Sequence, residues 1–75
     1  MPVLSVDPAR LRAARLAAGY SKEEAAVLIG VAYGTIAAYE AGKVVPHSPK
    51  LLALAQLYEV TVEELCSARP EQAAS

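Results

Sequence analysis

The sequence predicts an all-α domain, a compact bundle of five short helices, and three observations support this prediction. Alanine and leucine are abundant whereas Phe and Trp are absent, which favours close helix packing over an aromatic-rich sheet. Helix-capping residues recur just before each stretch of helical periodicity. The length, 75 residues, suits one domain with one small core.

The first helix is expected to begin after Asp7, whose carboxylate can accept a hydrogen bond from a free backbone N–H at the helix start. Pro8 suits the first helical position, because that position needs no N–H donor. The helix is expected to run to about Ala18. Gly19 can then supply the left-handed residue that ends it.

The second helix is expected to begin at "SKEE", a capping box in which the Ser21 hydroxyl and the Glu24 carboxylate each satisfy a free backbone donor. Gly30 ends this helix. The third helix covers residues 32–41, and Gly42 supplies the left-handed turn at its end. The linker "GVA" is so short that the second and third helices must meet at a sharp turn.

Ser48 and Pro49 begin the fourth helix, which continues through "KLLALAQLY". Thr61 and Glu64 form another capping box, which predicts a short fifth helix over "VEELCSA". This prediction places Cys66 on a helix, as a small apolar residue.

The domain is expected to span residues 7–69, between an N-terminal segment of residues 1–6 and a flexible tail of residues 70–75. Apolar residues recur at helical spacing and are expected to form one core. The expected core residues are Leu11, Ala14, Ala26, Ile29, Val31, Ile36, Tyr39, Leu51, Leu54, Ala55, Tyr58, Val60 and Leu65.

Charge and composition narrow the possible functions. The net charge of -1 divides into +2 over residues 1–50 and −3 over residues 51–75, so a nucleic-acid site is expected in the first part. No apolar run approaches the roughly 20 residues that cross a bilayer, and no signal peptide is expected. A single cysteine excludes an internal disulfide and suits a reducing cytoplasm.

The sequence does not suggest an enzyme. His47 and Cys66 are the only His and Cys residues, they are expected on different elements, and no serine has an evident base. A metal site needs more ligands than the chain concentrates anywhere, and no cofactor is expected. The glutamates at helix starts are explained by capping and the helix dipole.

Three motifs occur in order: "AGYS" before the capped second helix, "T-I-x-x-Y-E-x-G" in the third, and "L-A-x-L-Y-x-V-T-x-x-E-L" near the end. Over about residues 9–66 the chain thereby resembles the Cro and lambda-repressor-like helix-turn-helix family, also called the XRE family. The resemblance implies a five-helix DNA-binding transcriptional regulator whose third helix enters the major groove. It also implies an ion pair between Arg15 and Glu40. Physical chemistry supports this pair independently, because a lone charge beside an apolar packed face would be costly.

The resemblance also indicates which residues would contact DNA, and many of them have little or no side chain. The expected DNA-binding residues are Lys22, Ala32, Tyr33, Gly34, Thr35, Ala37, Ala38 and Lys43, with Lys50 as a further backbone contact. Relatives commonly carry Ser, Gln, Arg or Lys at several of these positions. Low base specificity is expected, because Ala and Gly cannot make the bidentate contacts that contribute about 1 to 3 kcal/mol each. The alternative to DNA contact is that the lysines are solvated surface charges and that Tyr33 is a partly packed aromatic residue.

Two kinds of partner follow from these observations. Double-stranded DNA is expected to be bound by a homodimer on two half-sites, and Val62, Leu65 and Cys66 are candidates for the dimer surface. Apolar residues at Leu16, Val27 and Leu28 stand where the family usually exposes charged residues. They either bind a partner protein, as in an adaptor or antitoxin-like module with weak or no DNA binding, or extend the core beneath residues 1–6.

Overall fold

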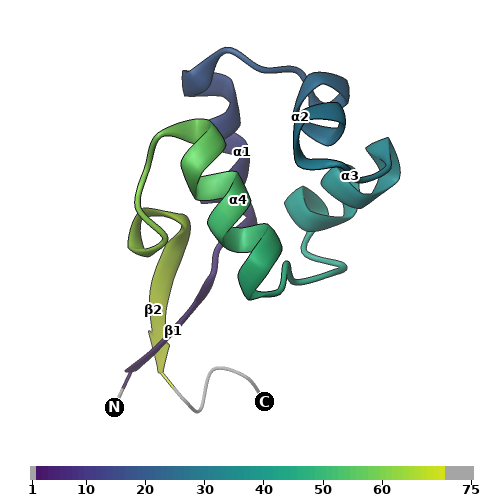
Figure 1. Ribbon diagram of the computed structural model, residues 1–75. Coiled ribbons are helices and arrows are strands. Elements are labelled where there is room, and N and C mark those ends of the chain that lie inside the picture. Colours follow the sequence, from purple (N-terminus) through teal and green to yellow (C-terminus); the bar gives the residue numbers. More distant parts are fainter. Residues whose placement is uncertain (1, 71–75) are drawn as a thin grey trace.

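The computed structural model describes the backbone of residues 2–70 and the side chains of residues 4–68. It contains four α-helices, one 3₁₀ turn and a two-stranded sheet (Figure 1). In chain order the elements are β1 (Pro2–Val6), α1 (Pro8–Ala18), α2 (Lys22–Ile29), α3 (Tyr33–Ala41), α4 (Ser48–Tyr58), η1 (Glu63–Leu65) and β2 (Cys66–Pro70). None of the helices in this described part is long and apolar enough to cross a membrane.

The helix boundaries follow the capping residues. At the start of α1, the Asp7 carboxylate accepts from the Ala9 N–H at 2.9 Å. At the start of α2, the Glu24 N–H donates to Ser21 Oγ at 3.0 Å, and the Ser21 N–H donates to Glu24 Oε1 at 2.8 Å. These short-range hydrogen bonds satisfy donors that the first helical turn leaves free. They explain why the predicted starts of these two helices agree with the structure.

The predicted fifth helix is wrong, and with it the prediction of an entirely α-helical domain. The capping box does form, because the Glu64 N–H donates to Thr61 Oγ1 at 3.1 Å. Only the single turn η1 follows, and Cys66 begins the extended strand β2 rather than continuing a helix. A helix nucleus is costly, and pairing with β1 gives this backbone another set of hydrogen-bond partners.

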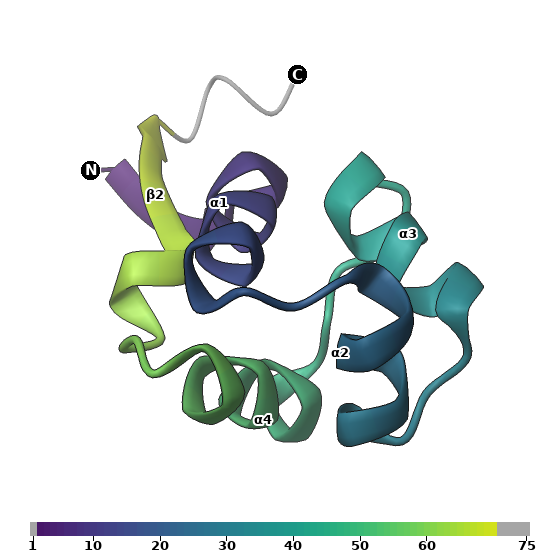
Figure 2. The ribbon, with the colours of Figure 1, turned by 90° about the horizontal axis from the view of Figure 1, so that it is seen from above.

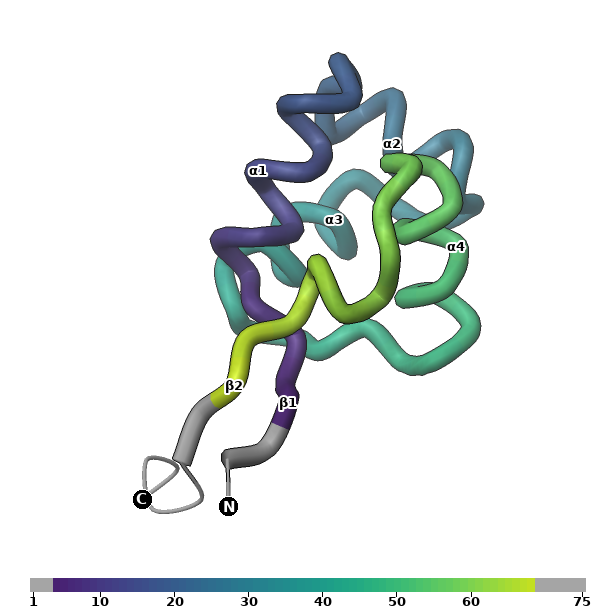
Figure 3. The backbone as a smooth tube through the Cα atoms, turned by 90° about the vertical axis from the view of Figure 1, so that its left-hand side faces the viewer, coloured from purple at the N-terminus to yellow at the C-terminus, as the bar shows by residue number. Residues whose placement is uncertain are grey.

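The strands β1 and β2 pair antiparallel, from Pro2 opposite Pro70 to Val6 opposite Cys66. Figure 3 shows them side by side, projecting from the helical body. Residues 2–6, expected as a separate N-terminal segment, therefore lie in a sheet with the end of the chain. Within the predicted tail of residues 70–75, Pro70 belongs to β2, and residues 71–75 lie outside the described part.

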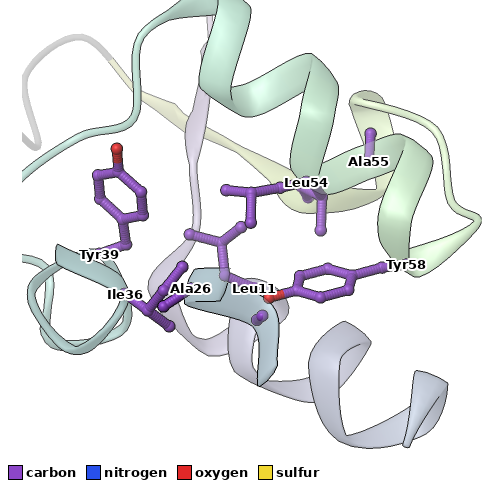
Figure 4. Close-up of a cluster of buried hydrophobic side chains, with 9 residues drawn as sticks. Leu11, Ala26, Ile36, Tyr39, Leu54, Ala55 and Tyr58 are labelled. Carbon is purple, nitrogen blue, oxygen red and sulfur yellow. The ribbon is translucent and has the colours of Figure 1, made fainter. Parts of the chain in front are cut away.

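The core lies between two groups of helices. Figures 1 and 2 show α2 and α3 together on one side, and α1 and α4 on the other. The buried residues that join the groups are Leu11, Ala25, Ala26, Ile36, Tyr39, Leu54, Ala55, Tyr58 and Leu65, most of them labelled in Figure 4. Every expected core residue belongs to this cluster or packs against it half-buried. The fully buried Ala25 was not predicted.

Candidate nucleic-acid interface

The connection between α2 and α3 is a sharp turn over residues 30–32. Gly30 has a φ of 84°, a left-handed conformation that a residue without Cβ adopts readily. The N–H groups of Gly30 and Val31 both donate to the Ala26 carbonyl at 2.9 Å. Val31 then packs against the core, so the turn fixes the direction in which α3 leaves α2.

Burial of one side of α3 exposes the other. Ile36 and Tyr39 are only 1% and 6% exposed, so they hold α3 against the core. At 3.6 residues per turn, the opposite side of the helix consists of Tyr33, Gly34, Ala37, Ala38 and Ala41, which we call the outer face of α3. Ala37 and Ala38 are half-buried and the other three are exposed, with Tyr33 at 50%. Thr35, beside this face, is half-buried.

The beginning of α3 is unusually bare. Ala32 occupies the N-cap position, is exposed, and offers no side chain to cap the helix. The Thr35 N–H donates to the Ala32 carbonyl at 2.9 Å, and no side chain caps the N–H groups of Tyr33 and Gly34. A Cβ added at Gly34 would meet nothing within 4 Å, so the protein's own packing does not require glycine there. The outer face of α3 therefore presents backbone, methyl groups and one tyrosine.

An ion pair ties the end of α3 to α1. The Arg15 Nε–Glu40 Oε2 distance is 2.7 Å, the Arg15 Nη2–Glu40 Oε1 distance is 3.1 Å, and Arg15 Nη1 donates to the Tyr20 carbonyl at 2.8 Å. The hydrogen bonds to Glu40, more than its charge, raise the pKa of Arg15. Both side chains are nearly buried, at 6% and 5% exposed, so this arginine is not available to an external phosphate.

The three candidate lysines lie at the edges of the helix-turn-helix. Lys22 is half-buried at the first position of α2, Lys43 is exposed just after α3, and Lys50 is half-buried in α4. Among the described side chains the ion pairs are Arg10–Asp7 and Arg15–Glu40, so none of these lysines belongs to one. Glu23 and Glu24 stand beside Lys22, and their charges weaken the attraction of phosphate to the start of α2.

Leu16, Val27 and Leu28 do not extend the core. They are 53%, 78% and 59% exposed, so the alternative of a core beneath residues 1–6 is wrong. Val27 and Leu28 line a shallow, mostly apolar pocket of about 400 Å³, together with Tyr20, Glu23 and Glu24. The structure thus has a second surface, on the outside of α2, that is suited to an apolar ligand group.

Two further sequence predictions need correction. Leu65 is completely buried, so it cannot contribute to a dimer surface, and Val62 packs half-buried against the core. Cys66 is a free, half-buried thiol on β2 and not on a helix. The capping box at Thr61 predicts where a helix begins but not how long it is, so the local pattern does not indicate the strand.

The described residues contain no group of three or more His, Cys, Asp or Glu that could hold a metal ion. His47 is exposed at the N-cap position of α4, and its side chain makes no capping hydrogen bond. Val44 and Val45, in the loop after Lys43, are a further exposed apolar pair that no sequence prediction covers, at 48% and 62% exposed. Two adjacent apolar residues in a loop were the available signal for this exposed apolar surface.

Comparison with known proteins agrees with this architecture. The family model of the helix-turn-helix domain matches residues 9–67. Among solved structures, the restriction-modification controller protein C.AhdI from Aeromonas hydrophila is similar, with a TM-score of 0.72 and 31% sequence identity over 77% of this chain and 88% of that chain. The comparison with curated proteins gave no match.

Proposed function

Because the chain belongs to the XRE-type helix-turn-helix family, we propose that it is a transcription regulator that places α3 in the major groove of double-stranded DNA. The family consists of DNA-binding domains, so the chain is a DNA-binding regulator and not an enzyme. The name of the similar structure, a restriction-modification controller protein, supports a regulatory role. The proposal rests on the outer face of α3, which has few side chains that extend beyond Cβ, whereas the opposite side of the helix is buried in the core.

A bare helix face suits close approach to a groove. Ala37 and Ala38 expose methyl groups that can contact a thymine methyl, and Gly34 leaves room for the DNA backbone or a base edge. Tyr33 has the hydroxyl best placed to reach a base edge or phosphate, because half of its surface is exposed. Thr35 can contact a phosphate. Such a surface reads few bases by hydrogen bonding, so low base specificity follows.

Lysines at both ends of the motif would contact the phosphate backbone. Lys22 is the first residue of α2 and Lys43 follows the end of α3, so each would contact a phosphate near one end of the motif. Contacts of this kind release counterions, which makes the affinity fall as salt rises. They also contribute equally to every DNA sequence.

We further propose that the protein acts as a homodimer. One domain with few base contacts gains affinity when two copies bind two half-sites, because the second binding event becomes intramolecular. In helix-turn-helix proteins the half-sites lie about 34 Å apart, one turn of DNA. The operator would then be an inverted repeat of short, weakly specified sites.

The test compares Tyr33→Ala with Lys22→Ala, in fluorescence titrations against DNA flanking the protein's own gene and against random duplex DNA. We expect Tyr33→Ala to reduce the discrimination between the two DNAs, because it removes the principal side chain on the outer face of α3. Lys22→Ala should weaken both complexes alike and reduce the salt slope by about 1. Unchanged affinities for both variants would rule out the docking of α3.

A second candidate function is supported by the exposure of Leu16, Val27 and Leu28. On the same fold, an adaptor or antitoxin-like module would use these exposed apolar side chains to bind a partner protein, with weak or no DNA binding. The dependence of binding affinity on salt concentration distinguishes the two functions. Lysine–phosphate contacts weaken steeply as salt rises, whereas apolar association does not. Val27→Ala should leave DNA binding unchanged and weaken only an apolar protein complex.

A further inference from the structure

A pocket of about 200 Å³ lies between the strand β1 and the loop that follows α3. Val6 and Pro8 line it from the N-terminal part of the chain, and residues 44–46 line it from the loop. Gly42 brings these two walls together, since a Cβ added there would lie 3.3 Å from Pro8 Cγ. The walls are largely apolar, and no charged residue is among the described residues that line the pocket.

Two hydroxyl groups at this pocket have no hydrogen-bond partner among the described residues. Ser5 Oγ is buried and unpaired. Tyr39 is 6% exposed, and its hydroxyl, which points away from the other labelled core side chains in Figure 4, takes part in none of the side-chain hydrogen bonds. Folding removes such a group from water without replacing the hydrogen bond, which is unfavourable. Both residues line the pocket, so a ligand there can restore these bonds, for the serine after rotation about its Cα–Cβ bond.

The backbone of β1 adds a further donor and acceptor on the same side. The Asp7 N–H donates to the Leu65 carbonyl at 2.9 Å, so Val6, one residue earlier, directs its N–H and C=O away from β2. Val6 also lines the pocket. Apolar walls with a few polar groups on one side are typical of small-molecule sites.

Water alone is a poor occupant of this pocket. About 200 Å³ holds several waters, since one water takes roughly 30 Å³, and each water needs two to four polar partners. The side chains of residues 44–46 offer none. Val44 and Val45 are moreover 48% and 62% exposed, and an occupant that covers them gains the free energy of apolar burial.

We propose that this pocket binds a small, uncharged phenol or aromatic alcohol. An apolar cavity of about 150 Å³ accepts a benzene ring, so about 200 Å³ accepts a ring with one or two further heavy atoms. The ring packs against the valines and prolines, and the ligand hydroxyl, which is both donor and acceptor, pairs with Ser5 and Tyr39. A charged ligand is disfavoured, because no charged group lines the pocket to offset the cost of its desolvation.

The site is separate from the proposed DNA-binding surface. No residue of the outer face of α3 lines the pocket, although Val44 directly follows Lys43. The inference therefore goes beyond the proposed function and does not depend on it. A protein that binds the ligand but no DNA would overturn the proposed function and leave this site standing.

The test is an NMR titration of the isotope-labelled protein with phenol as the probe. We expect saturable shifts of the backbone amides of Val6, Gly42 and Val45, which line the pocket. Benzoate, which has a similar shape but is charged, should not produce these shifts. Equal binding of benzoate, shifts centred instead on Val27 and Leu28, or no saturable shifts would overturn the proposal.

Ser5→Ala and Ser67→Ala form a matched pair, since the two serines are opposite each other in the sheet and only Ser5 lines the pocket. Ser5→Ala should weaken phenol binding about three- to tenfold through the lost hydrogen bond. It should not lower the melting temperature of the free protein, because Ser5 Oγ has no partner to lose. Ser67→Ala should change phenol binding by less than about twofold. Equal effects of the two variants on phenol binding would overturn the proposal.

Tyr39→Phe keeps the test decisive if Ser5→Ala does not fold. This variant retains the ring in the core and removes only the hydroxyl. It should weaken phenol binding about three- to tenfold and leave the binding of toluene, which has no hydroxyl, unchanged. Unweakened phenol binding, or the same loss for phenol and toluene, would contradict the proposed hydrogen bonds.

Discussion

At the position of Arg15, one guanidinium group connects three parts of the chain. It bridges α1 to Glu40 of α3 through two hydrogen bonds, and it also holds the carbonyl of Tyr20 in the connection to α2. A buried charge is stable only when it is paired and hydrogen-bonded, and both conditions are met here. The pair therefore fixes the placement of α3, the helix proposed to contact DNA.

The first prediction concerns this residue. Arg15→Met should lower the free energy of unfolding by roughly 1 to 4 kcal/mol, because Glu40 would remain nearly buried without a partner. Arg12→Met is the matched control: Arg12 is exposed on the same helix and outside the ion pairs found among the described side chains, so its change should stay within about 0.5 kcal/mol. Urea unfolding measures both, and equal midpoints for the two variants would disprove a stabilising role for the pair.

At the scale of the element, α3 shows a conflict between stability and its proposed use. Gly34 is the second residue of α3 and stands in open space, and glycine in a helix costs up to about 0.5 to 1 kcal/mol relative to alanine. The uncapped start after Ala32 is a further local weakness. Both features are unfavourable for the isolated domain, and both are consistent with a helix start that approaches another molecule closely.

The second prediction follows from Gly34. Gly34→Ala should stabilise the protein by about 0.5 to 1 kcal/mol and weaken DNA binding, since its methyl group would occupy the surface proposed to enter the groove. Gly42→Ala is the control with the opposite effect on stability: its φ is 76° and its Cβ would lie 3.3 Å from Pro8 Cγ, so it should destabilise. Thermal unfolding and a DNA titration measure the two effects. Unweakened DNA binding by Gly34→Ala would exclude close approach at this position.

At the scale of the whole molecule, a buried tyrosine in the core lowers the stability of the folded protein at alkaline pH. Tyr58 is 5% exposed, and its ring lies 6.4 Å from that of Tyr20. Burial, more than the nearby charge of Glu40, raises the pKa of Tyr58 from 10.0 to about 12. The Tyr58 phenol ionises at a lower pH in the unfolded chain than in the folded one. Its contribution to the free energy of unfolding is therefore complete below pH 10 and is lost as the pH rises to about 12.

The third prediction is an alkaline unfolding profile. The free energy of unfolding should fall by roughly 2 to 3 kcal/mol between pH 10 and about 12 through Tyr58. Tyr58→Phe should lack this part of the fall, because phenylalanine has no ionisable group. Urea unfolding at a series of pH values measures the profile, and the same decline in the variant would assign the loss to other groups.

The sequence by itself determined the helices of residues 8–58 and almost all of the core. Capping residues such as Ser21 and Glu24 act over a few positions, and helical periodicity records which side of each helix is buried. The sequence also identified the DNA-binding family, because the motifs of the family lie on these same helices.

Only the tertiary structure decided the two ends of the chain and the state of the outer apolar residues. The pairing of Val6 with Cys66 joins segments far apart in sequence, so no local pattern near Thr61 could show that η1 stops after one turn. In the same way, the exposure of Leu16 and Val27 depends on which elements pack over them, and none of the described elements buries them. Local hydrogen bonds fix where a helix begins, whereas burial and strand pairing depend on the whole chain.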